Sequence, residues 1–241
     1  MIKIANHCHY HKALARALIE GIQPIACDDD FTLKIEDDAL ALCARLGGQN
    51  TCFTHALTDQ RLLRRVQQKN QSLLKACNNK KHSIKSVCDL TAGWGKDSLI
   101  LASHGQQVTM VEHNLLIFQC MNFLLKIAQH DHPAASYERM KLLHDNSLAY
   151  IDSRNRGFAD CLYLDPMFPA HKSTAKPGKE LQLLQRLTEN VEVDDLFMMA
   201  LQKAAQRVVV KRPLHAPALE GAKPDIVYRE KTIRFDVYLV N

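Results

Sequence analysis

The sequence predicts an α/β protein whose core is a doubly wound, mostly parallel sheet preceded by a small α+β element. From Ser86 onward, short apolar runs typical of strands alternate with longer amphipathic stretches typical of helices. Within Ser86–Asp97 (SVCDLTAGWGKD), a strand, a glycine-containing turn and the start of a helix follow one another, which is the geometry of a ligand site at a helix N-terminus. The runs Ile226–Arg229 and Ile233–Leu239 predict a closing antiparallel pair.

Residues 1–55 form the predicted N-terminal element. Two short strands are expected over Ile2–Ile4 and Phe31–Ile35. A helix is expected over Asp37–Leu46, because acids stand at its start and Gly47-Gly48 follow its last apolar residue.

The predicted main domain, 56–241, begins with a basic helix over Thr58–Cys77. Seven Lys or Arg residues and no acid occur from Arg61 to Lys81. A helix face of this kind is either simply solvated or contacts phosphates. We expect phosphate contacts from its first four basic residues, Arg61, Arg64, Arg65 and Lys69.

The remaining elements follow in alternation. Strands are predicted over Gln107–Val111, Lys141–Leu143, Asp160–Leu164 and Arg207–Val210. Helices are predicted from the capping residue Asn114 to about His130, and over Gly178–Thr188 and Asp194–Gln206.

Composition and cysteine spacing bear on whether the protein binds nucleic acid or metal, contains disulfides, is secreted or crosses a membrane. The net charge of +5 permits a nucleic-acid partner without requiring one. None of the eight cysteines forms a C-x-x-C pair, so we expect reduced cysteines that serve as small hydrophobic residues in a cytoplasmic protein. The start of the chain lacks the apolar segment of a signal peptide, and no apolar run is long enough for a membrane helix. The cluster His7, Cys8, His9 and His11 has no second cluster to complete a metal site, so no metal is expected.

Acidic or polar groups follow four of the predicted strands. Asp89 precedes the glycines Gly93 and Gly95, Glu112 ends the next strand, Asn146-Ser147 follow the third and Asp165 ends the fourth. The carboxyl ends of parallel strands meet at one edge of a sheet, where ligands bind. A dinucleotide-binding G-x-G-x-x-G is incomplete, because Ser98 stands at its third position. An acid followed by x-x-x-G-x-G instead favours S-adenosyl-L-methionine (SAM), whose cationic amino end suits Asp89.

The segment Asp165-Pro166-Met167-Phe168 resembles the D/N-P-P-Y/F/W motif of methyltransferases that act on exocyclic amines. Such an amine is a poor nucleophile, because its lone pair is delocalised into the ring. A carboxylate and the Pro166 carbonyl can accept its N–H groups, localise the lone pair and stabilise the charge that develops. Phe168 can stack on an unpaired base.

The part of the chain from Ser86 onward, which contains the glycine loop and the four strand ends, resembles the J-type small-subunit ribosomal RNA methyltransferases. The resemblance is most specific in LDPMFP and VVVKRP. The resemblance implies a seven-stranded, Rossmann-like class I sheet. It also implies methylation of a guanine N2 in 16S rRNA, free or in the small subunit, with S-adenosyl-L-homocysteine as the second product. The implied cofactor contacts are Lys96, Asp97, Glu112, His113, Asn146, Ser147 and Asp165. RNA contacts are further expected from Lys172, Lys211 and Arg212.

Other functions fit parts of the pattern. An NAD-dependent dehydrogenase shares the strand–turn–helix unit, and a non-catalytic RNA-binding assembly protein would share the fold. DNA adenine N6 or a protein glutamine amide could be the acceptor for the same amine chemistry.

Overall fold

The computed structural model describes residues 2–23, 31–46, 48–69, 71–78, 83–132, 134–166 and 193–240. It divides into two compact units. Of the described residues, the first unit comprises those within 1–63 and 114–133, and the second comprises those within 64–113, 134–166 and 191–241. Among the described residues, no helix combines the length and the apolar character needed to cross a membrane.

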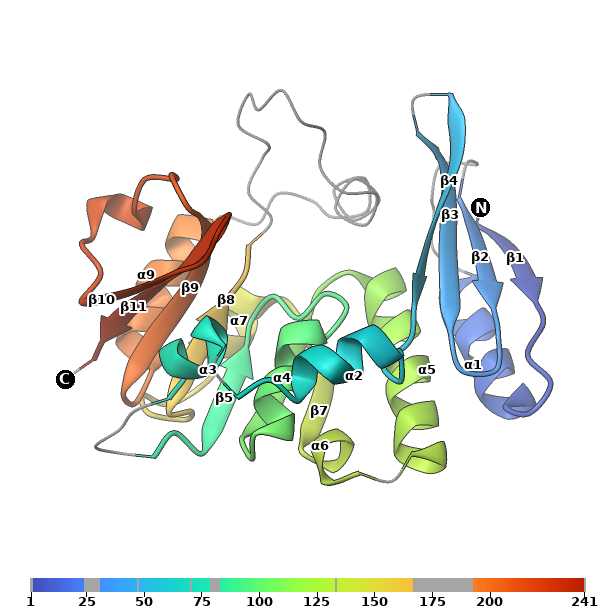
Figure 1. Ribbon diagram of the computed structural model, residues 1–241, viewed down its shortest axis with the longest axis horizontal. Helices are drawn as coiled ribbons and strands as arrows, with labels where there is room; N and C mark the ends of the chain where they lie inside the picture. The colour runs from blue at the N-terminus through green and yellow to red at the C-terminus, as the bar shows by residue number, and fades with distance from the viewer. Residues whose placement is uncertain are drawn as a thin grey trace. The chain divides into compact units, whose positions relative to one another are not determined.

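The first unit contains a four-stranded sheet and two long helices that contact each other (Figure 1). The sheet order is β1-β2-β3-β4, with β1 parallel to β2 and the other pairs antiparallel. Its elements are β1 (Lys3–Asn6), α1 (Lys12–Ile22), β2 (Thr32–Ile35), β3 (Leu40–Leu46), β4 (Gln49–His55) and α5 (Leu115–Asp131).

The helix predicted over Asp37–Leu46 is wrong, because Leu40–Leu46 forms strand β3. This strand pairs with β2 on one side and β4 on the other. The apolar residues of the segment fit a helical spacing, but two backbone neighbours and a buried face stabilise the extended form. Gly48, just before β4, has φ +84°, a conformation that suits a tight turn between antiparallel strands.

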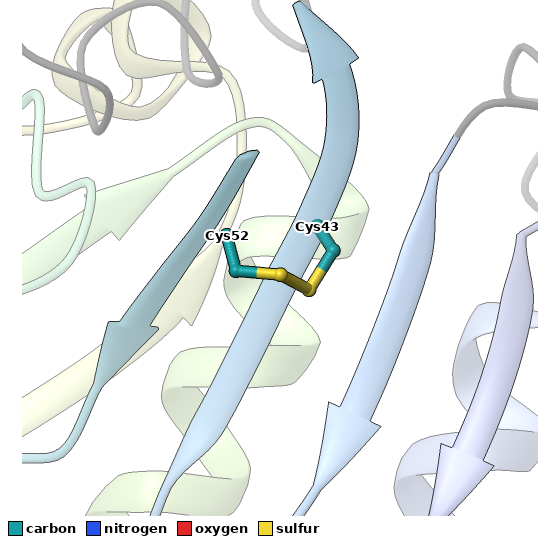
Figure 2. Close-up of a disulfide and its surroundings, with 2 residues drawn as sticks. All are labelled: Cys43 and Cys52. Atoms are coloured by element: carbon teal, nitrogen blue, oxygen red, sulfur yellow. A yellow bond between two sulfur atoms is a disulfide. The ribbon is translucent and has the colours of Figure 1, made fainter. Parts of the chain in front are cut away.

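A disulfide joins β3 to β4, so the prediction that the cysteines are all reduced is wrong for Cys43 and Cys52. These residues are direct cross-strand partners (Figure 2). The described cysteines that remain are free and buried, as expected of small hydrophobic residues: Cys8, Cys77, Cys88, Cys120 and Cys161.

The single helix predicted over Thr58–Cys77 is two helices, α2 (Gln60–Val66) and α3 (Ser72–Ala76). The side chain of Gln71 explains the break. Its amide nitrogen donates to the carbonyl oxygens of Arg65 (2.8 Å) and Gln68 (2.9 Å) at the end of α2. Bonds of this kind satisfy carbonyls that a continuing helix would have paired.

The second unit holds the seven-stranded sheet, in the order β10-β11-β9-β8-β5-β6-β7. Strands β7, β6, β5, β8 and β9 are parallel, and β10 and β11 are antiparallel. The strands are β5 (Ser86–Asp89), β6 (Gln107–Glu112), β7 (Met140–His144), β8 (Cys161–Leu164), β9 (Arg207–Pro213), β10 (Ile226–Arg229) and β11 (Ile233–Leu239). The predicted doubly wound sheet and its terminal antiparallel pair are confirmed.

Helices cover both faces of this sheet, and Figure 1 shows α3 and α4 on the near side of the strands and α9 on the far side. Phe197 of α9 packs edge-on against Tyr238, the strand partner of Val208. Arg207, which points to the opposite face, donates to the carbonyl of Ala76 in α3. The helices of this unit are α3, α4 (Lys96–Ser103), α6 (Ala135–Glu138), α7 (Ser147–Asp152), α9 (Val193–Lys203) and the short 3-10 turn η1 (Leu219–Gly221).

The strand order places a switch point between β5 and β8. After β5 the chain adds β6 and β7 on one side, and it then returns to add β8 and β9 on the other. Ligands of open α/β sheets bind beyond the carboxyl ends of the strands at such a point. The predicted helix over Gly178–Thr188 lies outside the described residues.

Candidate active site

The loop from Leu90 to Gly95 lies at this switch point and is held by the neighbouring strands. The Leu90 N–H donates to Tyr163 of β8 (3.0 Å), and the Ala92 N–H donates to Val111 of β6 (3.2 Å). Both glycines of the loop have positive φ, +50° at Gly93 and +64° at Gly95, where other residues would be strained. Gly95 is also the N-cap of α4, so the loop delivers the chain directly to a helix N-terminus.

Asp89 ends β5 beneath this loop, with only 2% of its surface exposed. Its carboxylate accepts the Ser98 hydroxyl at 2.6 Å and the Thr91 N–H at 3.1 Å. Burial raises the pKa of Asp89 to about 7, even though both hydrogen bonds favour the ionised form. The charge of this residue therefore changes in the physiological range of pH.

Glu112 at the end of β6 lies on the other side of the loop. Its Oε2 accepts the Gly93 N–H at 2.9 Å, so the acid and the glycine turn fix each other. The next residue, His113, approaches Glu112 Oε1 at 3.5 Å, and its carbonyl contacts the His144 ring at 3.1 Å. A carboxylate at this strand end can accept a pair of vicinal hydroxyls, as a ribose would offer.

Asn146 and Ser147 follow β7 and open helix α7. The Asn146 side chain caps this helix by accepting the Ala149 N–H at 3.1 Å. Ser147 is buried and donates its hydroxyl to the Leu90 carbonyl at 2.5 Å. Ser147 therefore anchors the glycine loop from the β7 side, and Asn146 remains exposed beside it.

Asp165 and Pro166 follow β8 on the far side of the loop. The Asp165 N–H donates to the Thr91 hydroxyl at 2.6 Å, so the main chain at the end of β8 is tied to the glycine loop. The Asp165 side chain is 38% exposed, which leaves it accessible to a ligand. The other predicted residues of this region, Phe168 and Lys172, lie outside the described residues.

A charged cluster joins Asp165 to Asp97 at the start of α4. The ammonium group of Lys211 lies 2.7 Å from Asp165 Oδ2 and 2.9 Å from Asp97 Oδ2. Asp97 also accepts the Tyr163 hydroxyl at 2.7 Å and approaches the Arg65 guanidinium at 3.5 Å. Burial alone would raise the pKa of Asp97, but Lys211 and these partners outweigh it and lower that pKa.

The predicted RNA-binding residues fall into two groups. The basic residues on and directly after α2 are exposed: Arg61, Arg64, Arg65 and Lys69. Arg212, in contrast, is 5% exposed, and its guanidinium donates to the Pro217 carbonyl. We therefore leave Arg212 out of the phosphate contacts proposed below.

Sequence reasoning missed three residues that support the site, namely Thr91, Ser98 and Tyr163. Ser98 stands where a dinucleotide-binding loop has its third glycine, and that position could have indicated a hydroxyl directed at Asp89. The bonds from Thr91 to Asp165 and from Tyr163 to Asp97 join residues 74 and 66 positions apart, and no local pattern announces them.

The histidine-rich start of the chain contributes one side chain to a small polar cluster in the first unit. His11 and His130 each bond Asp131, at 2.7 Å and 2.6 Å, and these are the described residues whose ligand atoms lie close enough to share a metal. Lys12 and Lys126 line the same cavity, and their positive charge opposes a bound cation. The cluster is thus satisfied as a hydrogen-bonded network.

The residues of the site suit SAM in their backbone conformation and their acidic groups. Glycines allow a ligand to approach the backbone at Gly93–Gly95, and Glu112 supplies acceptors for ribose hydroxyls. The site holds four acidic side chains beside the cations Lys211, Arg65 and Lys96, and acidic groups suit a cofactor that carries a sulfonium and an ammonium group. The carboxylates are those of Asp89, Asp97, Glu112 and Asp165.

Comparisons with known proteins agree with this reading. Residues 22–240 match a family model described as "Putative SAM-dependent methyltransferase". Ribosomal RNA small subunit methyltransferase J of Shewanella baltica (strain OS195) is 38% identical over 217 residues, which cover 87% of this chain and 86% of the relative. The protein of the same name from Coxiella burnetii (strain Dugway 5J108-111) is 37% identical over 173 residues, covering 71% and 67%.

A solved structure agrees with the fold of the whole chain. A SAM-dependent methyltransferase from Neisseria gonorrhoeae has a TM-score of 0.71 and 28% identity, covering 99% of this chain and 95% of its own. The dehydrogenase alternative is therefore set aside. The chain belongs to the family of SAM-dependent methyltransferases that includes the proteins named ribosomal RNA small subunit methyltransferase J.

Proposed function

We propose that this protein transfers the methyl group of SAM to the exocyclic N2 amine of a guanine in 16S rRNA. The bond between the Asp165 N–H and the Thr91 hydroxyl carries the proposal. It ties a carboxylate suited to amine chemistry to the glycine loop expected to hold the cofactor. The names of the relatives from Shewanella and Coxiella support small-subunit rRNA as the substrate.

The residues of the site have separate roles in this proposal. Cofactor contacts are assigned to the glycine loop and to the polar groups around it, namely Asp89, Gly93, Gly95, Lys96, Asp97, Glu112, His113, Asn146, Ser147 and Asp165. When bound, SAM supplies an electrophilic methyl group on a positively charged sulfur. The Asp165 carboxylate and the Pro166 carbonyl accept the N–H groups of the amine, and Phe168 stacks on the base.

Asp165 acts chiefly through its charge. An ionised carboxylate localises the nitrogen lone pair as the new N–C bond forms, and it opposes the positive charge that develops on the nitrogen. The methylated amine then loses one proton, for which Asp165 is an available acceptor. The role requires a group that is ionised and accessible, and the side chain of Asp165 is partly exposed.

The basic residues exposed around α2 are proposed to contact RNA phosphates. We propose that the protein acts in the bacterial cytoplasm, where its proposed substrate, ribosomal RNA that is free or assembled in the small subunit, is found. The exposed positive charge increases the rate of encounter with RNA but does not itself select a nucleotide.

The test is single-turnover methyl transfer to unmodified 16S rRNA at saturating SAM, with Asp165→Asn as the variant. This change keeps the size of the side chain and removes its charge, so the rate should fall about 100-fold or more while RNA binding changes little. Asp195→Asn, at an exposed position of α9, is the matched control and should react as the wild type does. A near-wild-type rate for Asp165→Asn would contradict the assignment.

The same assay separates the other candidate functions. Transfer of a tritiated methyl group is measured to 16S rRNA, to duplex DNA and to a glutamine-containing protein fraction. Transfer to RNA alone, recovered as N2-methylguanosine, supports the proposal. Binding of RNA without any transfer would instead identify a non-catalytic assembly protein.

A further inference from the structure

Lys211, which the sequence analysis expects to contact RNA, lies between the carboxylates of Asp97 and Asp165. Strands β8 and β9 are parallel, and Leu164 is the register partner of Val210. One residue further along both strands, Asp165 stands beside Lys211, and their charged groups meet at 2.7 Å. The Lys211 side chain is only 20% exposed and lies between two carboxylates, whereas a residue that binds RNA phosphates is normally open to solvent.

Lys211 contacts this group of acids more closely than Arg65 does. It contacts Asp97 and Asp165 directly, and Asp89 on β5, whose pKa is about 7, interacts electrostatically with both of these acids. Two neighbouring carboxylates cannot both ionise readily unless a cation compensates them. Arg65 compensates Asp97 from its outer side at 3.5 Å, and the Tyr163 hydroxyl donates to the same carboxylate.

The pKa values of Asp165 and Lys211 shift in the directions that this geometry requires. Burial raises the pKa of Asp165, the charge of Asp97 adds to the rise, and the ammonium of Lys211 opposes it. Burial would lower the pKa of Lys211, but Asp165 and Asp97 outweigh it and raise that pKa, so Lys211 stays charged. A permanent positive charge is therefore bound beside the carboxylate that the reaction needs in its ionised form.

We propose that Lys211 is a positioning residue for methyl transfer, which holds Asp165 ionised and fixed at the end of β8 through their ion pair. This inference rests on the proposed role of Asp165 as the carboxylate that accepts the amine. A protonated Asp165 would lose its negative charge, and one of its two oxygens would become a donor instead of an acceptor for the substrate amine. Without Lys211, Asp165 would be neutral over more of the working range of pH.

The experiment measures the ionisation of Asp165 directly, without any methyl transfer. Aspartate carboxyl groups labelled with ¹³C are titrated by NMR in the full chain, and Asp165→Asn identifies the Asp165 signal. In Lys211→Met the midpoint for Asp165 should move up by roughly 1–3 pH units, which is the effect of losing an adjacent opposite charge. Lys211→Arg should restore much of the wild-type midpoint.

Lys203→Met is the matched control, because the Lys203 ammonium binds the main-chain carbonyls of Asp152 and Arg154 instead of a carboxylate. It should leave the Asp165 midpoint unchanged. Fluorescence of Trp94, the single tryptophan of the chain, reports whether each variant is folded. If Lys211→Met does not fold, Lys211→Gln takes its place, since it removes the same charge with a polar side chain.

A second readout is the pH profile of single-turnover methyl transfer, whose acidic limb should shift upward by the same amount in Lys211→Met. An unchanged NMR midpoint for Asp165 would overturn the inference. A weaker salt dependence of RNA binding in Lys211→Met, together with an unchanged Asp165 midpoint, would also overturn it and would identify Lys211 as a phosphate contact. If the midpoint shifts but wild-type protein methylates no RNA, the ion pair has the inferred effect and the proposed function is wrong.

Discussion

Replacing Asp89 with Asn removes a charge that the second unit holds almost completely out of water. In the folded protein its pKa is about 7, against 3.8 as the ordinary value. The folded state therefore binds this proton more tightly than the unfolded chain does. Wild-type stability is therefore not reduced by Asp89 below about pH 4, where the carboxyl group is protonated in both states. The free energy of unfolding then falls as the pH rises toward 7, where the folded protein also begins to lose this proton.

The magnitude follows from these two values. Ionisation of Asp89 costs the folded state about 4 kcal/mol at pH 8 and about 1.5 kcal/mol at pH 5. Asn does not titrate. Any stability that the variant loses because Asn bonds Ser98 and Thr91 less well than Asp does is therefore taken to be the same at both pH values. The difference in free energy of unfolding, variant minus wild type, should therefore rise by about 2.5 kcal/mol between pH 5 and pH 8.

The assay is urea unfolding at both pH values, followed by Trp94 fluorescence, which reports on the glycine loop itself. Asp160→Asn is the control. Burial would raise the pKa of Asp160, but hydrogen bonds from Ser86 and Lys85 outweigh it and lower that pKa, so this residue is ionised throughout the range. Its difference from wild type should not change with pH. A pH-independent difference for Asp89→Asn would refute the reasoning.

Three further predictions concern the cofactor, the RNA and the first unit. Glu112→Gln keeps an acceptor for the Gly93 N–H but loses the charge facing the ribose, so calorimetry should show SAM binding weaker by about 1.5–3 kcal/mol; equal affinity would remove Glu112 from the cofactor site. A second variant replaces the exposed basic residues Arg61, Arg64 and Lys69 by Gln. The slope of log Kd for RNA against log salt should fall by about 0.7–0.9 per lost contact, and SAM affinity should not change. An unchanged slope would show that this helix face is only solvated. Replacing both Cys43 and Cys52 by Ser removes a disulfide between residues nine positions apart and should destabilise the first unit by about 3 kcal/mol. The loss is measured by urea unfolding followed by circular dichroism, and reductant should cause the same loss in the wild type.

The part of the chain around the glycine loop could be predicted because its signals are local. A strand that ends at Asp89, glycines at positive φ and a helix that starts at Lys96 are contiguous in the sequence. The capping side chain of Asn114 likewise marks the start of α5, where it accepts the Ile117 N–H. Each of these features is determined by residues within a few positions of one another.

Features that depend on strand register could not be predicted in this way. Cys43 can face Cys52 only if both stand in paired strands, and the apolar spacing before Gly47 indicated a helix instead. Lys211 was assigned to RNA because its charge is visible in the sequence, whereas its partner Asp165 lies 46 residues earlier. The pairing of β8 with β9 brings them together, and the sequence around either residue contains no sign of it.

The most direct test of the central claim is nucleoside mass spectrometry of 16S rRNA from cells that lack this protein. We predict the loss of one N2-methylguanosine, which returns when the wild-type protein is supplied and does not return with Asp165→Asn. A 16S rRNA whose methylated guanosines are the same with and without the protein would contradict the account.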